Sequence, residues 1–529
     1  MTIPRTLTPA VLSGFHDIVG AEFVITDPAE LSYYSTDVYR GFEIALAVLQ
    51  PENAQQLREI VSLCKQNGLS IVTRGGGMSY TDSYLHKSAR GVSIDMRRMN
   101  RIIDINTRDM IVTVECGCTW QKLNEALAVH GLRPPYWGPL SGMRATIGGA
   151  LSQNSVFWGG TSHGTAAESV LGLDVLLGNG EVLPTGAHGK KDGVPFMRYD
   201  GPDLTGLFIG DSGALGIKTV ATLRLVTIPA VVKYASFSFE THQQICAAMS
   251  EIGRRGLASE CYGFDPFLQN SRVVGGDADV VEDVKTLARV AGTSGLKESV
   301  KIAAGGRRFI RKVQWGLHVH VEDRCEAGAD HALAEIDKIA DENGAAGIAN
   351  SLPVIMGSHP FPPTNSMVGP NGERWVPIHG KVAHSQASET IGKIQDLFRQ
   401  NKAVLEKYNI DTGYLICTVG NTAFLVEPVF FWPDELNEVH RRNVEPDVFN
   451  RFTPAPANPE ARSEAERIRN EVRGIFLEQG AIHFQIGKYY PYKDSRRDPA
   501  WSMLGRIKDL LDKDGVLNPG QLGLNEAGS

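Results

Sequence analysis

Apolar runs separated by glycine-rich turns dominate residues 1–228 of the chain. Apolar positions three and four residues apart predict a helix over 53–67. Shorter apolar runs predict strands over 69–73, 92–95, 102–106, 111–115 and 170–177. The Asn179-Gly180 step lies between two apolar runs and predicts a tight hairpin turn. These residues therefore form one predicted strand-rich domain with interleaved helices.

The pattern changes after Pro229. Alternating or short apolar runs predict strands over 234–240, 313–321, 376–383 and 412–419. Amphipathic spacing predicts helices over 243–253, 279–291, 330–343 and 385–408. This alternation of predicted strands and helices indicates one antiparallel sheet with helices on one face. We therefore divide the chain into residues 1–228, a second domain over 229–490 and a C-terminal segment over 491–529, which includes a helix over 499–512.

Composition and charge exclude several classes of protein. The 529 residues carry a net charge of −7 and show no basic stripe, so a nucleic-acid partner is not expected. No stretch of about 18 apolar residues is present, so no membrane span is expected. The seven cysteines are thinly spread and the first residues lack a signal-peptide pattern, which favours a cytoplasmic location.

Glycines are concentrated in four segments, 74–79, 141–149, 159–160 and 210–216. Glycine lets a backbone approach a ligand closely, and consecutive N–H groups can converge on an anion. Ordinary turns are the alternative for any one segment. The chain lacks a GxxxxGK[ST] loop, and it lacks a GxGxxG turn with an acidic residue about 20 positions later, so P-loop and Rossmann sites are not predicted.

The order of the glycine motifs is specific. It runs through Ile71–Gly77, Gly91–Met96, Val114–Gly117, Ala145–Gly149, Gly172–Val175, Asp203–Ile217 and Asn518-Pro519-Gly520. In this order the chain resembles the flavoprotein family of vanillyl-alcohol oxidase and p-cresol methylhydroxylase, to which D-lactate dehydrogenase and glycolate oxidase are related. The resemblance covers most of residues 40–228 and 465–524.

The resemblance implies an α+β fold with FAD as cofactor. Residues 1–228 would form a PCMH-type FAD-binding domain of two subdomains, residues 229–490 a cap domain with a helix-covered antiparallel sheet, and the C-terminal segment would return to the FAD domain. A homodimer is also implied. The cofactor-binding residues would be Arg74, Gly75, Gly76, Gly77, Met78, Ser79, Tyr80, Pro139, Leu140, Ser141, Thr146, Ile147, Gly148, Gly149, Ser152, Asn154, Gly216, Ile217 and Asn518.

Relatives with covalent flavin use a histidine at the position of Met78, a cysteine near Gly142, or a cap-domain histidine near Leu425 and Val426. None of these positions holds the required nucleophile. Non-covalent FAD is therefore expected.

Two substrate motifs of the family are also missing. The metal-binding His pair and Glu-His motif of the D-lactate type are replaced by Cys417–Thr422 and His483–Gly487, so no metal is expected. The Tyr-Arg pair that holds a phenolate is replaced by Phe484-Gln485.

The segment 483–492 is rich in histidine and aromatic residues. If it begins as a strand, His483 and Gln485 share one face. The segment would then be either a substrate-facing strand, with Tyr489 following it in the chain, or a core strand followed by an aromatic loop. Glu427 lies in an apolar run, where a carboxylate is costly unless it is paired or functional.

Two further histidine positions leave alternatives open. His379 is flanked by apolar residues and is either a general base or a hydrogen-bonded core histidine. His318, His320 and Glu322 alternate along one predicted strand, which makes them a polar surface under the substrate or a solvent-facing side.

The sequence thus predicts an FAD-dependent oxidase or dehydrogenase that transfers a hydride from an aromatic alcohol or para-substituted phenol to flavin N5. The predicted catalytic residues are His483, Gln485, Tyr489, Glu427 and His379. Oxygen or a redox protein would accept the electrons. One alternative is a metal-free D-2-hydroxy-acid dehydrogenase that binds the carboxylate through Lys488 or Arg74; another is a catalytically silent flavin-binding protein.

Overall fold

The computed structural model describes residues 6–269 and 313–525, which fall into two compact units. Unit 1 comprises Met1–Val156, Thr165–Ile228 and Phe484–Ser529, and unit 2 comprises Phe157–Gly164 and Pro229–His483. The predicted helix over 279–291 lies outside the described residues. No described helix is both long enough and apolar enough to cross a membrane.

The unit boundaries differ from the predicted ones at two places. The chain returns from unit 2 to unit 1 at Phe484 and not after residue 490. Residues 157–164 also join unit 2, because the Gly159 N–H donates to the Glu260 carboxylate and the Cys261 N–H donates to Thr161 Oγ1.

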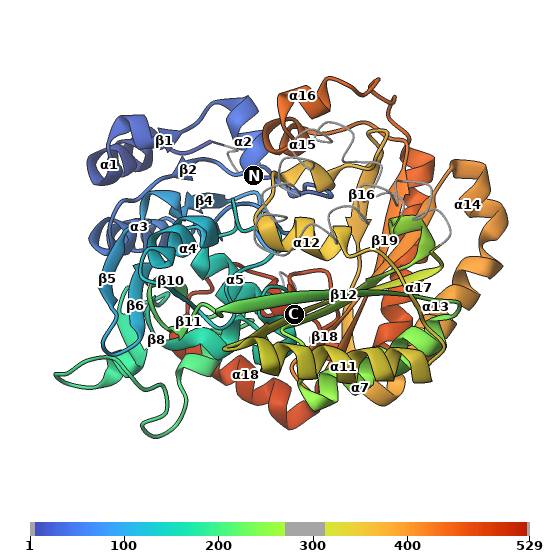
Figure 1. Cartoon of the computed structure of the whole chain (residues 1–529). Coiled ribbons are helices and arrows are strands. Elements are labelled where there is room, and N and C mark those ends of the chain that lie inside the picture. Colours follow the sequence, from blue (N-terminus) through green and yellow to red (C-terminus); the bar gives the residue numbers. More distant parts are fainter. Residues whose placement is uncertain (1–5, 270–312, 526–529) are drawn as a thin grey trace. The chain divides into compact units, whose positions relative to one another are not determined.

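The described part of unit 1 contains two larger sheets and one two-stranded sheet (Figure 1). The first has the order β1-β2-β4-β3, with β3 and β4 parallel, and the second is antiparallel in the order β5-β6-β10-β8-β9. The strands are β1 (Val24–Ile25), β2 (Val48–Leu49), β3 (Ser70–Arg74), β4 (Gly91–Asp95), β5 (Ile102–Asn106), β6 (Ile111–Glu115), β8 (Val170–Leu176), β9 (Val182–Gly186) and β10 (Ile217–Arg224), and the short pair β7 (Leu132–Arg133) and β11 (Val226–Thr227).

The helices of unit 1 follow from caps and apolar stripes. In α3 the Asn53 side chain caps the first turn and Leu57, Ile60 and Val61 are buried, which confirms the helix predicted over 53–67. The described helices of this unit are α1 (Pro9–Val19), α2 (Pro28–Tyr34), α3 (Ala54–Gln66), α4 (Trp120–Ala128), α5 (Ile147–Gln153) and α18 (Asp498–Leu511).

The C-terminal segment completes the first sheet of unit 1. The Ile71 N–H donates to the Val516 carbonyl over 2.7 Å, and the Asn518 N–H donates to the Ile71 carbonyl over 2.8 Å. Residues 516–518 therefore run beside β3, the strand that leads into the first glycine loop.

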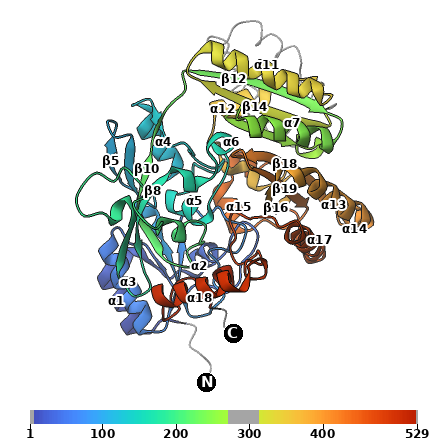
Figure 2. The same ribbon diagram turned by 90° about the horizontal axis from the view of Figure 1, so that it is seen from below.

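Unit 2 is built on an eight-stranded antiparallel sheet in the order β15-β12-β14-β13-β18-β19-β16, with β17 also paired to β19. The helices α7 and α11 lie along it (Figure 2). The strands are β12 (Val231–Phe239), β13 (Glu260–Phe264), β14 (Trp315–Asp323), β15 (Ala346–Gly347), β16 (Arg374–Pro377), β17 (Gly380–Ala383), β18 (Asp411–Val419) and β19 (Ala423–Trp432). An antiparallel sheet with helices is what the sequence predicted.

The described helices of unit 2 include four that were not predicted, α12, α15, α16 and α17, and one predicted helix is divided. The helix predicted over 385–408 is interrupted at Asn401, which ends α13 and precedes α14. The helices are α6 (Gly160–His163), α7 (His242–Arg255), α11 (Glu326–Glu342), α12 (Ser351–Ser358), α13 (Ala387–Gln400), α14 (Lys402–Tyr408), α15 (Glu438–Asn443), α16 (Pro446–Phe449) and α17 (Pro459–Glu478).

Candidate active site

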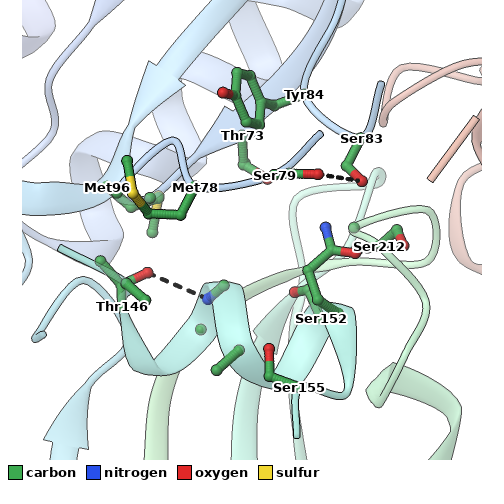
Figure 3. Close-up of a pocket in the computed structure, with 18 of the residues that line it drawn as sticks. Thr73, Met78, Ser79, Ser83, Tyr84, Met96, Thr146, Ser152, Ser155 and Ser212 are labelled. Carbon is green, nitrogen blue, oxygen red and sulfur yellow. Dashed lines mark hydrogen bonds between the residues drawn. The ribbon is translucent and has the colours of Figure 1, made fainter. Parts of the chain in front are cut away.

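A pocket of about 910 Å³, open mouth included, lies in unit 1. Figure 3 shows that hydroxyl side chains, Ser79, Ser83, Ser152 and Ser212 among them, surround it. Lys218 is the one charged residue among those that line it, and a 2.6 Å ion pair with buried Asp211 neutralises it. The wall is therefore polar but carries little net charge.

The loop that follows β3 contributes Gly75, Gly76, Gly77 and Met78 to the wall. Within the described part of the chain, the backbone N–H groups of these four residues donate no hydrogen bond. A Cβ atom at Gly76 would collide with the Arg144 carbonyl oxygen, so glycine is required for this close packing. Consecutive unused N–H groups at a pocket wall are suited to binding an anionic diphosphate.

The second glycine segment packs beneath the pocket. Thr146 caps α5 by accepting from the Gly149 N–H over 3.2 Å, and the Gly148 N–H donates to the Cys116 carbonyl over 2.8 Å (Figure 3). Cys116 also lines the pocket, and burial raises the pKa of its thiol to about 12. The thiol is therefore protonated and a poor nucleophile at neutral pH.

The structure gathers most of the predicted cofactor residues at this pocket. Those that line it are Gly75, Gly76, Gly77, Met78, Ser79, Pro139, Ser141, Thr146, Gly148, Gly149, Ser152, Gly216 and Ile217. The predicted residues that do not line it are Arg74, Tyr80, Leu140, Ile147, Asn154 and Asn518.

The position of Arg74 has a physical reason. Its guanidinium lies over the rings of Tyr33, Tyr34 and Tyr84, with centroids 4.5, 4.9 and 5.2 Å away. Cation–π contacts of this kind hold the buried side chain in the core of unit 1. Arg74 thus supports the loop from behind and is not part of the pocket wall.

Sequence reasoning missed several residues of the wall. Some belong to motifs already noted, such as Met96 at the end of β4 and Ser212 and Gly213 in the fourth glycine segment, and so could have been found. The missed residues are Thr73, Ser83, Tyr84, Met96, Cys116, Ala145, Ala150, Gln153, Ser155, Ser212, Gly213 and Lys218.

Gln485 is the predicted catalytic residue that lines the pocket. Its φ of 48° lies in the left-handed region, which is uncommon for a residue other than glycine. Its Nε2 donates to the Tyr80 hydroxyl over 3.4 Å, whereas its buried Oε1 accepts no hydrogen bond from the described residues. A buried acceptor left open beside a pocket is costly unless a ligand satisfies it.

The segment 483–492 is not the strand that the sequence predicted. The N–H groups of Gln485 and Lys488 donate to the carbonyls of Gln153 and Thr81, and the Gly487 N–H donates to the Ser212 hydroxyl. Tyr489 is buried next to Tyr490, outside the pocket lining.

The other predicted catalytic residues belong to unit 2. His483 Nδ1 lies 2.7 Å from the His379 carbonyl oxygen, so Nδ1 carries the proton and Nε2 is the nitrogen that can accept one. His379 is fully buried between β16 and β17, which the sequence had predicted as a single strand. Burial, and then the charge of His483, hold the pKa of His379 well below its usual range.

A polar row crosses the unit 2 sheet. By register, Ser236, His318, Tyr262, Cys417, Leu425 and Lys381 lie side by side on six strands. Glu427, two residues from Leu425 on β19, shares this face. The α7 helix covers the opposite face, because a Cβ atom at Gly263 would meet Ile245.

His318 and His320 are buried, so the solvent-facing alternative for this strand is wrong. His318 bonds Ser236 Oγ at 3.0 Å and Gln269 Oε1 at 3.1 Å, and His320 Nε2 lies 3.2 Å from the Tyr262 hydroxyl. Burial lowers the pKa of both histidines to about 3. Both are therefore neutral at physiological pH.

Neither group offered for a substrate carboxylate lines the pocket. Arg74 lies among the tyrosines, and the Lys488 ammonium donates to backbone carbonyls and to Asn518. A D-2-hydroxy-acid enzyme would need another cation. Lys381 in the polar row of unit 2 is such a group, and burial lowers its pKa to about 8.

Comparison with known proteins identifies part of the chain. Residues 45–186 match the family model described as an FAD binding domain. Glycolate oxidase subunit GlcD of Bacillus subtilis is 31% identical over 222 residues, which cover 42% of this chain and 45% of the relative. D-lactate dehydrogenase [cytochrome] of Arabidopsis thaliana is 34% identical over 192 residues, which cover 36% of this chain and 32% of that protein. The chain thus spans less than half the length of these relatives.

Two solved structures match the whole chain. A p-cresol methylhydroxylase with bound substrate gives a TM-score of 0.72 at 17% identity, and the match covers 99% of both chains. The 4-ethylphenol oxidase of Gulosibacter chungangensis gives a TM-score of 0.70 at 18% identity, again over 99% of both chains. At this identity the likeness shows a shared fold, including its PCMH-type FAD-binding domain.

Proposed function

We propose that this chain, which carries an FAD-binding domain, is an FAD-dependent oxidoreductase. The observation that supports this most is the row of unused N–H groups from Gly75 to Met78 in the wall of a pocket lined by hydroxyl side chains. Bound FAD would supply the hydride acceptor. The pocket wall would hold the diphosphate by backbone N–H and hydroxyl groups, since Lys218 is already paired with Asp211.

The proposal also assigns roles to single side chains of each unit. His483, with its Nδ1 proton held by the His379 carbonyl, accepts the proton of the substrate hydroxyl through Nε2. Gln485, two residues later in the chain, orients the substrate or cofactor through its open Oε1. Glu427, 8% exposed, is a second candidate proton acceptor.

The substrate class that we propose is an aromatic alcohol or a para-substituted phenol. Aromatic rings are frequent at the polar face of unit 2. The ring centroids of Phe157 and Tyr262 are 5.9 Å apart, and those of Trp158 and His320 are 5.7 Å apart. Aromatic side chains favour aromatic ligands through stacking and edge contacts. Oxygen or a redox protein as electron acceptor, and a homodimer, remain part of the proposal.

A D-2-hydroxy acid is the second candidate substrate. The names of the curated relatives, glycolate oxidase and D-lactate dehydrogenase, favour it, as does the buried ammonium of Lys381. A carboxylate beside Lys381 would be stabilised by charge pairing in a low-dielectric site.

The test is anaerobic reduction of the purified flavoprotein. Aryl alcohols, para-alkylphenols and D-2-hydroxy acids are added in turn, and the visible flavin band is recorded. Bleaching by the aromatic compounds supports the first candidate, and bleaching by hydroxy acids alone supports the second. If dithionite bleaches the band and none of these compounds does, the chain is a catalytically silent flavin-binding protein for these classes.

A matched pair of variants separates the two candidates further. Lys381→Met should slow reduction by a hydroxy acid about tenfold or more and leave reduction by an aryl alcohol nearly unchanged. His483→Gln should slow both by roughly a hundredfold, the usual contribution of a general base.

A further inference from the structure

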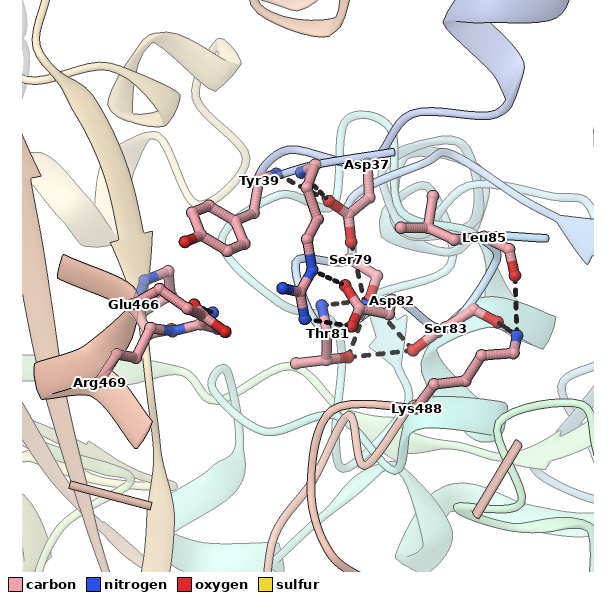
Figure 4. Close-up of polar contacts among 12 residues, drawn as sticks. Asp37, Tyr39, Ser79, Thr81, Asp82, Ser83, Leu85, Glu466, Arg469 and Lys488 are labelled. Atoms are coloured by element: carbon pink, nitrogen blue, oxygen red, sulfur yellow. Dashed lines mark hydrogen bonds and ion pairs between the residues drawn. The ribbon is translucent and has the colours of Figure 1, made fainter. Parts of the chain in front are cut away.

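Lys488 differs from two well-buried lysines of unit 1 in the groups that surround its ammonium. Lys218 and Lys508 each form a 2.6 Å ion pair, with Asp211 and Asp512. Half-buried Lys488 donates instead to three neutral acceptors: the Leu85 carbonyl at 3.0 Å, the Ser83 carbonyl at 3.4 Å and Asn518 Oδ1 at 2.5 Å (Figure 4). Among residues 6–269 and 313–525, no carboxylate forms an ion pair with this ammonium.

The nearest acidic group does not cancel this charge. Asp82 accepts two hydrogen bonds from Arg40, at 2.8 and 2.6 Å, and is neutralised there. In Figure 4 the Lys488 ammonium lies beside Leu85 and Ser83 and points away from Asp82. Asp82 is therefore paired with Arg40 and forms no ion pair with Lys488.

Asn518 links this ammonium to the pocket wall. Its Nδ2 donates to the carbonyls of Ser83 and Ser212, both at 3.0 Å, which fixes the orientation of the amide and points Oδ1 at Lys488. Ser83 and Ser212 line the pocket, and so does Gln485. The positive charge therefore lies one residue layer behind this part of the wall.

We propose that Lys488 is a positioning residue whose ammonium, held by Asn518, stabilises negative charge on a flavin ring bound against Ser83, Ser212 and Gln485. The inference rests on the proposed function. In this proposal the unused N–H groups of the loop 75–78 bind the diphosphate. The hydroxyl groups of Ser83 and Ser212 and the amide of Gln485 can hydrogen-bond to the polar edge of the flavin ring. Two electrons and one proton leave the ring with one negative charge, and a nearby cation favours that state.

Other charges near Lys488 define the pH dependence. Burial lowers the pKa of Lys488 to about 7; Asp82 raises it and Lys87 lowers it. Burial lowers the pKa of the neighbouring His86 to about 3, so His86 stays neutral. Burial and Asp82 raise the pKa of Asp37 to about 7, so Asp37 titrates in the same range.

The experiment measures the ratio of reduced to oxidised flavin at equilibrium with a redox dye of fixed potential. For Lys488→Met we expect this ratio to fall about tenfold to thirtyfold, the effect of one unit charge at intermediate distance and screening. Lys488→Arg should stay within about threefold of the native protein. Lys87→Met, which removes a charge outside this hydrogen-bonded set, should change the ratio less than about twofold.

A pH series covers the case in which Lys488→Met does not fold. Above pH 7 the native protein should lose reduced flavin relative to Lys488→Arg, because the lysine deprotonates and the arginine does not. Asp37 is present in both proteins, so its titration cancels. A constant difference between the two from pH 6 to 9 would overturn the inference.

Two further outcomes are decisive. If Lys488→Met binds FAD more weakly while its loaded fraction keeps the native ratio, the ammonium serves the diphosphate and the inference is wrong. If the native protein retains no FAD after desalting, the proposed function fails and the inference with it, whereas retained FAD with an unchanged ratio overturns only the inference.

Discussion

At the scale of single residues, Gln485 and Lys488 lie three positions apart in the chain and differ in how fully their polar atoms are hydrogen-bonded. The Lys488 ammonium uses its donors fully, while Gln485, three residues earlier, leaves a buried carbonyl oxygen without a described partner. Gln485 also keeps a left-handed backbone that only a well-fixed surrounding can impose. Open hydrogen-bonding capacity combined with backbone strain makes Gln485 a candidate for a role in ligand binding, which we propose.

Replacing Gln485 by leucine tests this. The apolar side chain removes a buried acceptor that has no protein partner, so the free energy of unfolding of the FAD-free protein should stay within about 1 kcal/mol of the native value or rise. The rate of flavin reduction by substrate should fall about tenfold or more. Urea unfolding and anaerobic stopped-flow absorbance measure the two effects. A large loss of stability with unchanged reduction would mean that Gln485 is structural.

At the scale of elements, the strand β3 and the loop after it decide how the pocket forms. β3 lies between β4 and residues 516–518, so its end is fixed before the chain enters Gly75–Met78. The loop then packs on residues 144–146 closely enough to exclude any side chain at Gly76. This close backbone contact fixes the path of the loop along the pocket wall.

The variant Gly76→Ala should therefore lose both stability and cofactor. The added Cβ collides with the Arg144 carbonyl, which should cost about 1–3 kcal/mol in the free energy of unfolding and weaken FAD binding at least tenfold. The matched control is Gly505→Ala in α18, where a Cβ meets nothing within 4 Å. That variant should be about 0.5–1 kcal/mol more stable than the native protein and should bind FAD normally. Equal behaviour of the two would contradict the packing argument.

The strand β14 makes unit 2 sensitive to acid. The pKa values of His318 and His320 are about 3 in the folded protein, and an unfolded histidine has a pKa near 6.5. Below pH 6.5 the unfolded state therefore binds protons that the folded state does not. The stabilisation is complete above pH 6.5 and is lost toward pH 3, by about 1.4 kcal/mol per pH unit for each histidine.

Urea unfolding at pH 7.0 and 5.5 checks this expectation. The variant His320→Gln should lose about 1 kcal/mol less stability between the two pH values than the native protein does. The variant His331→Gln, at an exposed position of α11, serves as the control. An unchanged pH effect in His320→Gln would show that His320 is protonated in the folded state.

Elements with a clear apolar period could be predicted, and those set by tertiary contacts could not. The spacing of Leu57, Ile60 and Val61 was enough for α3. The strand predicted over 376–383 was wrong because the chain breaks at His379, where the Ile378 N–H bonds the Pro428 carbonyl between two separate strands. The left-handed turn at Gln485 has no local signal, since glycine is the residue that such a turn favours.

At the scale of the whole molecule, the pocket collects residues from distant parts of the sequence. Ser79, Ser152, Ser212 and Gln485 lie far apart along the chain and line one space. The glycine motifs and the family resemblance predicted nineteen cofactor residues, and thirteen of them line this pocket. Arg74 does not line the pocket because its guanidinium stacks on three tyrosine rings in the core of unit 1. The sequence motif does not reveal these contacts.

Non-covalent FAD is the whole-molecule prediction. Met78 occupies the position of one covalent anchor, and the Cys116 thiol in the wall is protonated. Precipitation with acid should therefore leave the yellow chromophore in the supernatant, and the protein band in a denaturing gel should show no flavin fluorescence. Added FAD at a hundred times its Kd should stabilise the FAD-free protein by about 2.7 kcal/mol. A fluorescent band would demonstrate a covalent bond to a residue outside these positions.

The return of the chain at Phe484 has a consequence for biosynthesis. Gln485 in the pocket wall, Asn518 behind it and residues 516–518 beside β3 all leave the ribosome after unit 2 has been made. The nascent chain can fold unit 2 as a separate body while the flavin site is still missing a wall, and contacts over such long sequence separations form late. Cofactor capture should thus be among the last events of maturation, and ribosome-bound chains stalled before residue 484 should not retain FAD.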